Sequence, residues 1–199
     1  MKNSVLALLA AMPLLAGPIT QAERDALAQS LKSTSEKFHK AVAGLSEAQY
    51  NFKASPERWS IAECAEHIAV SEDMLRSLVT DRVMKGPATP DKIEERKQKD
   101  PVVIGGVVDR SQKFQAPEAL VPTRRFATLD AAVAQFDESR KKTAEYAAST
   151  EDDLRAHSAP HPALKELDAY QWLLLLSGHS ERHTLQILEV KEAPGFPKH

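Results

Sequence analysis

The stretch DAYQWLLLLSGHSERHTLQILEVKE, residues 168–192, determines the fold of this chain more than any other segment. Asp168 and Gln171 stand three residues apart, the spacing of a capping box that begins a helix. Pro194 and Gly195 follow the segment and predict its end. Its apolar residues recur with helical periodicity, so residues 170 to 192 are predicted to form a long helix that packs along one stripe.

Two histidines lie on this apolar stripe instead of on the polar side of the helix. At about 100° per residue, His183 falls within about 40° of His179, and Gln186 falls within about 20° of it. Glu181 points about 160° away from His179. This arrangement differs from the H-E-x-x-H metalloprotease motif, in which a glutamate directly follows the first histidine.

Three more segments have helical periodicity: residues 23–44, 61–84 and 130–149. Four helices of similar length predict an all-α fold, a four-helix bundle. The link at residues 85–128 is irregular and proline-rich, and its PVVIGGVV run (101–108) suits either a short strand or a turn of helix. The link is long enough to cross the whole bundle and make the second and third helices parallel. So long a connection is expected to have a function.

The second helix carries an inward-facing histidine of its own. His67 lies on the same stripe as Met74 and Leu78. Burying a polar group without a partner costs roughly 1–3 kcal/mol, so three inward histidines need an explanation. A metal ion shared by His67, His179 and His183 is one, because three nitrogen ligands leave a coordination position open for water or substrate. The alternative is a structural bundle whose core histidines have other partners.

Other candidate side chains have simpler interpretations. His39 is expected to be exposed, and His157 and His161, which flank Pro160, are expected to make hydrogen bonds within a loop. Ser60 and Glu63 form a second capping box, and Trp59 is expected to pack at the bundle end. Cys64 lies off the axis of the histidines, which favours a buried, unreactive thiol.

Composition excludes several classes of protein. The 199 residues carry a formal net charge of −2, with no basic cluster, so we expect no nucleic-acid partner. A single cysteine excludes an internal disulfide framework and a cysteine-rich zinc site.

Residues 1–16 predict a cleaved signal peptide. Lys2 is followed by an apolar run that is too short to span a bilayer. Cleavage after Ala16 leaves intact the capping box of Thr20 and Glu23. We therefore expect a periplasmic or secreted protein with no membrane span after processing. The alternative is a cytoplasmic protein in which this run leads into the first helix.

Two motifs carry a resemblance to a known family. RWSIAECAEHI (58–68) resembles the W-S-x-x-E-x-x-x-H motif of the DinB-like superfamily, and HSERHTLQI (179–187) resembles its H-x-x-x-H-x-x-Q-I motif. The resemblance implies a DinB-like four-helix bundle over residues 20–193 with up-down-down-up topology. It also implies a divalent metal ion, zinc or nickel, held by His67, His179 and His183.

The expected function is a metal-dependent enzyme that hydrolyses an unknown small-molecule substrate. Gln186 could orient a metal-bound water or a ligand ring. The resemblance also implies a thiol transferase as an alternative, since some family members use low-molecular-weight thiols. A chain outside the cytoplasm would lack such thiols, which favours hydrolysis. A non-catalytic metal- or ligand-binding protein is the third alternative, and a homodimer stays open.

Overall fold

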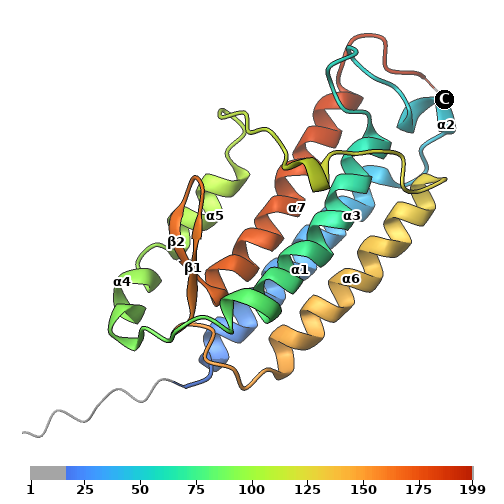
Figure 1. The fold of residues 1–199 in the computed structure, drawn as a ribbon. Helices are drawn as coiled ribbons and strands as arrows, with labels where there is room; N and C mark the ends of the chain where they lie inside the picture. The colour runs from blue at the N-terminus through green and yellow to red at the C-terminus, as the bar shows by residue number, and fades with distance from the viewer. Residues whose placement is uncertain (1–16, 199) are drawn as a thin grey trace, which may run out of the picture.

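The structure, a computed structural model, describes residues 17–198 and is a four-helix bundle (Figure 1). Its long helices are α1 (Gln21–Val42), α3 (Ile61–Leu78), α6 (Leu129–Ser149) and α7 (Ala169–Lys191). They run up, down, down and up, so α3 and α6 are parallel, as predicted. The predicted signal peptide at 1–16 lies outside the described residues. Within residues 17–198, no helix is long and apolar enough to cross a membrane.

Side-chain caps fix where the bundle helices begin. Complete capping boxes join Thr20 to Glu23, Ser60 to Glu63 and Asp168 to Gln171, as the sequence predicts. Helix α3 continues into a π-helical turn, η1 (Val79–Val83), which accounts for the longer second helix expected from the sequence. The predicted helices therefore agree with the observed ones to within a few residues.

The long link between α3 and α6 contains helices of its own. These are η2 (Pro90–Lys92), α4 (Ile93–Lys97), α5 (Asp100–Val108) and η3 (Glu118–Leu120). Residues 101–108 are therefore helical, and α5 packs on α7. At this contact a Cβ on Gly178 would lie 3.2 Å from Val107 Cγ1, so the glycine permits the close approach. After α5 the link passes in front of α7 and α3 to reach α6 (Figure 1).

A short helix and a β-hairpin were not predicted. Helix α2 (Glu47–Tyr50) lies in the first connection, and strands β1 (Ser158–His161) and β2 (Lys165–Asp168) form an antiparallel hairpin. From the sequence, residues 150–167 are expected to form a loop with one short turn, and the hairpin corrects this expectation. His161 Nδ1 accepts the N–H groups of Ala163 and Leu164 and closes the turn, a role for which the sequence has no Asn-Gly-type signal.

A buried arginine at the centre of the bundle connects its four helices. Arg140 of α6 donates to both carboxylate oxygens of Glu72 in α3, at 2.7 and 2.8 Å. The same guanidinium donates to Leu31 O and Thr34 Oγ1 of α1 and to Ser180 Oγ of α7. Arg140 and Glu72 are 5% and 1% exposed. Each N–H group of the Arg140 guanidinium therefore has an acceptor, and these acceptors lie on the other three helices of the bundle.

We expect Glu72→Ala to lower the free energy of unfolding by about 3–5 kcal/mol, because it leaves the Arg140 charge buried without a counter-ion. Chemical denaturation measures the change. Glu138→Ala is the control, since Glu138 pairs with Lys142 on the surface of α6, and its loss should change stability by about 0.5 kcal/mol or less. Equal effects of the two substitutions would contradict the central role of Arg140.

The single cysteine belongs to the core. Cys64 is fully buried between apolar side chains, and burial raises the pKa of its thiol. A thiol that is protonated and inaccessible does not react. We expect no reaction of native protein with a disulfide reagent such as Ellman's reagent, and reaction of one thiol after unfolding in denaturant. Rapid labelling of the native protein would show that Cys64 is accessible.

Candidate metal centre

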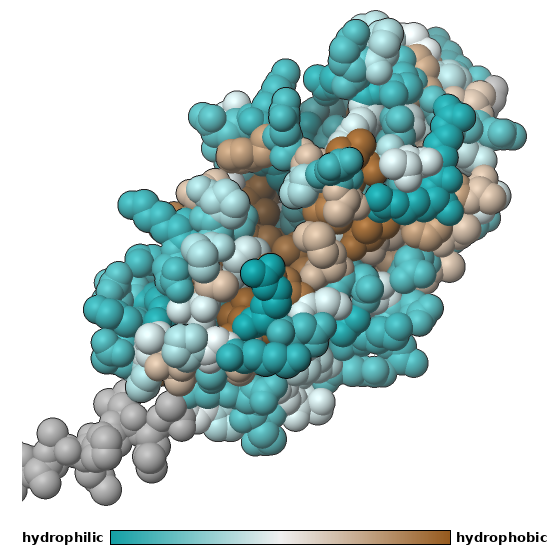
Figure 2. Space-filling model, viewed as in Figure 1, coloured by the Kyte–Doolittle hydropathy of each residue, from teal (hydrophilic) through white to brown (hydrophobic). Residues whose placement is uncertain are grey.

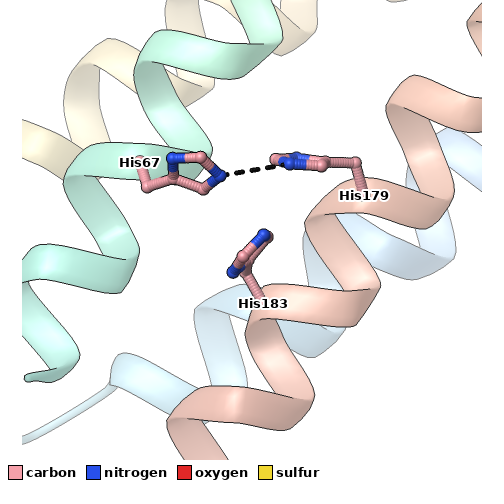
Figure 3. Close-up of side chains that lie close together, drawn as sticks. All are labelled: His67, His179 and His183. Carbon is pink, nitrogen blue, oxygen red and sulfur yellow. Dashed lines mark hydrogen bonds between the residues drawn. The ribbon is translucent and has the colours of Figure 1, made fainter. Parts of the chain in front are cut away.

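Three histidines from two helices converge on one point. His67 extends from α3, and His179 and His183 extend from consecutive turns of α7 (Figure 3). One ring nitrogen of each lies within 4.8 Å of the others, and His67 Nε2 is 3.1 Å from His179 Nε2. His67 is buried, whereas His179 and His183 are half-buried. The structure therefore brings together the three histidines that the sequence singled out, at a place that reaches the surface.

The outer nitrogens of two rings have oxygen partners. His67 Nδ1 lies 2.8 Å from Leu120 O, and His183 Nδ1 lies 2.9 Å from Gln186 Oε1. Because a carbonyl oxygen only accepts, each Nδ1 carries the proton, which leaves a lone pair on each Nε2. Such partners on the far nitrogen are typical of histidines that bind metals.

Burial keeps the three rings uncharged. It lowers the pKa of His67 and lowers that of His183 to about 3. The pKa of His179 falls well below its usual value, first because of burial and then because of the positive charge that His183 and His67 would carry. Metal ions bind neutral imidazole, so these groups need not lose a proton to bind one at neutral pH. The donor set therefore fits a divalent cation.

An aromatic side chain lines the cluster. The ring of Trp59 is 4.8 Å from that of His67 and 5.9 Å from that of His183, centroid to centroid. The sequence predicted only that Trp59 packs at the end of the bundle. Its contact with the histidines could not be found on a helical wheel, because Trp59 precedes the first residue of α3.

Carboxylates on the two histidine-bearing helices are all engaged elsewhere. Glu181 pairs with Lys37, away from the histidines, as the wheel predicts. Glu66 accepts from backbone N–H groups, and Glu63 accepts from Ser60 N in its capping box. The remaining carboxylates on these helices, each with an arginine partner, are Glu72, Asp73 and Glu189. Each carboxylate of these two helices thus has a partner within residues 17–198.

Two arginines hold the long link against α7. Arg182 donates to Val107 O, Asp109 O and Gln112 O at the end of α5 and just beyond it. Arg110 forms a two-pronged ion pair with Glu189, at 2.6 and 2.8 Å. Sequence reasoning assigned neither residue a role, because their partners are backbone atoms or a distant side chain.

The face beside the link is hollowed. Figure 2 shows hydrophobic side chains on the floor of a hollow over α7, between α5 and α3, with polar side chains around it. Met74, on the stripe of α3 that also carries His67, is 37% exposed.

The other histidines stay apart from the cluster. His157 Nδ1 donates to Gly86 O at 2.8 Å, and His161 closes the hairpin turn, so both have the loop roles predicted for them. His39 Nε2 bonds to Asp137 Oδ1 at the surface, and its side chain is 42% exposed, as expected. Cys64 does not belong to the group of side chains that could hold an ion.

Comparisons with known proteins identify the family. Residues 30–187 match the DinB superfamily. The uncharacterized protein YuaE of Bacillus subtilis is 30% identical over 151 residues, which cover 76% of this chain and 88% of YuaE. The structure of YfiT from Bacillus subtilis, described as a probable metal-dependent hydrolase with an unusual four-helix bundle topology, superposes with a TM-score of 0.55 at 17% identity. The alignment covers 90% of this chain and 92% of YfiT. Its fold, its motifs and these matches establish that the chain belongs to the DinB superfamily.

Proposed function

We propose that the chain is a metal-dependent hydrolase in which His67, His179 and His183 hold one divalent ion, zinc or nickel. The observation that carries the proposal is the convergence of three uncharged imidazoles, two of them with their outer N–H bonded to oxygen. The description of YfiT as a probable metal-dependent hydrolase supports the same class of reaction.

In the proposed site, the side chains of the protein bind the ion, orient the ligand rings and shield them from water. A divalent ion with three protein ligands supplies Lewis-acid chemistry, lowering the pKa of water and polarising a substrate oxygen. Gln186 holds the ring of His183 through its Nδ1–H, and Trp59 covers the rings of His67 and His183 against water. We place the substrate at the hollow beside α5, whose hydrophobic floor suits a small molecule with an apolar part (Figure 2).

Hydrolysis is preferred to thiol transfer because we also propose that residues 1–16 direct export, away from cytosolic thiols. One observation favours a second candidate, a metal- or ligand-binding protein without turnover. All carboxylates of α3 and α7 have partners, so neither helix supplies an unpaired acid or base beside the rings.

Metal analysis tests the site. Untagged full-length protein, saturated with zinc and then dialysed, should retain about one ion per chain, whereas His183→Ala should retain less than about 0.1, because two ligands no longer suffice. Bound zinc should raise the melting temperature of the wild type and not that of His183→Ala, since binding stabilises only a folded state that has the site. His157→Ala is the control and should keep the ion. Equal zinc in wild type and His183→Ala would refute the proposed ligand set.

Activity assays separate the candidate functions. Zinc- or nickel-loaded protein should release product from a panel of small esters and amides with apolar acyl groups. A chelator should abolish the activity, and the metal should restore it. Conjugation of a thiol to an electrophilic acceptor, without ester or amide cleavage, would favour thiol transfer instead. A loaded protein that catalyses neither reaction would favour the non-catalytic binding protein.

A further inference from the structure

The carbonyl that fixes the His67 ring belongs to the last part of the long link. Leu120 O accepts from His67 Nδ1 at 2.8 Å. Leu120 ends the single-turn helix η3, and its side chain is 5% exposed. This carbonyl determines that Nδ1 of His67 carries the proton and in which direction Nε2 points. A residue that holds the carbonyl in position therefore controls the orientation of the His67 ring.

Glu66 anchors the chain just after Leu120. Its Oε1 accepts from Thr123 N at 2.7 Å and its Oε2 from Arg125 N at 3.1 Å. Its side chain is only 5% exposed. Because Glu66 immediately precedes His67 in α3, neighbouring residues of one helix hold the link at two points.

Arg125 also holds the chain on both sides of Leu120. Its Nη2 donates to Ala119 O at 2.8 Å and to Val121 O at 3.5 Å, the carbonyls that flank that of Leu120. Its Nε also lies 3.9 Å from Glu66 Oε1. Arg125 thus engages the two flanking carbonyls and leaves the middle one to His67.

The backbone between the two anchored amides has an unusual conformation. Arg124 has φ of 63°, in the left-handed region that non-glycine residues rarely adopt. Arg124 therefore stands between Thr123 and Arg125, whose N–H groups both donate to the carboxylate of Glu66. Strain of this kind persists where surrounding contacts over-determine it. The two hydrogen bonds to the carboxylate of Glu66 are contacts of this kind. They hold a strained piece of backbone in place, which an incidental loop contact would not do.

We propose that Glu66 is a positioning residue for the metal ligand His67. Together with Arg125 it holds the Leu120 carbonyl against His67 Nδ1, so that the Nε2 lone pair faces His179 and His183. The assignment rests on the proposed function, because it gives His67 the role of ligand. Glu66 itself does not touch the ion or the substrate.

Two measurements on full-length protein test the assignment. Affinity for Co²⁺ or Zn²⁺, from competition with a chromophoric chelator, should fall about 10- to 100-fold in Glu66→Ala, the usual effect of losing the outer partner of a ligand. In metal-free protein, ¹⁵N NMR of the histidine rings should show His67 protonated at Nδ1 in the wild type and as a mixture of tautomers in Glu66→Ala. Glu66→Gln, which keeps one acceptor oxygen, should recover part of both effects.

Glu63→Ala is the matched control. It removes another α3 carboxylate that accepts from backbone, at Ser60 N, but that carboxylate has no link to Leu120. Its metal affinity and its His67 tautomer should equal those of the wild type. Should Glu66→Ala fail to fold, Arg125→Ala decides, because the Arg125 side chain is 33% exposed and outside the core; it should also weaken metal binding.

The outcomes separate this assignment from the proposed function. A folded Glu66→Ala protein, or an Arg125→Ala protein standing in for it, that has wild-type affinity and tautomer would overturn the assignment alone. Wild-type protein that binds neither Co²⁺ nor Zn²⁺ would overturn the proposed function and the assignment together.

Discussion

The ion pair of Arg140 and Glu72 fixes the relative positions of the helices that carry the candidate site. Glu72 lies five residues after His67 on α3, and Ser180, which Arg140 also contacts, directly follows His179 on α7. The pair therefore sets the register of the two helices next to the histidines. The ring nitrogens now lie within 4.8 Å of one another. A slip of α3 by one helical turn moves His67 by about 5.4 Å along the bundle and takes it away from His179 and His183. Such a shift would also part Arg140 from Glu72 and leave both charges buried without a partner, which is costly.

The up-down-down-up order of helices gives the long link its place. Parallel α3 and α6 require a connection that returns along the bundle, and that connection passes in front of α7 and α3. Arginines attach it to α7, and Glu66 attaches it to α3. The link then supplies Leu120 O to His67, so the topology itself brings backbone from a connection to the histidines. This is a physical reason for the length of the link, which the sequence left unexplained.

The sequence predicted the features that local rules control. Capping boxes at Thr20, Ser60 and Asp168 and the apolar stripes gave the four helices, and wheel angles plus two motifs gave His67, His179 and His183. It could not predict the Leu120 carbonyl, because a backbone acceptor has no side-chain signature. The contact of Trp59, the anchor at Glu66 and the hairpin closed by His161 also depend on tertiary neighbours, and no periodicity reports those. Helices that follow local rules are thus predictable, whereas the surroundings of the site are not.

The lack of negative charge on the three histidines gives the candidate functions one common requirement, an anionic ligand for the metal ion. Three neutral imidazoles would leave the double charge of a divalent ion uncompensated by its ligands. The nearby carboxylates already have other partners: Glu189 pairs with Arg110, and Glu66 accepts from backbone N–H groups. A centre of this kind attracts an anionic fourth ligand, as neutral-ligand zinc sites do. Ionised water, a thiolate and a substrate carboxylate all meet that condition. The three neutral histidines of the proposed site would therefore favour an anionic ligand, whichever of the proposed functions the chain has.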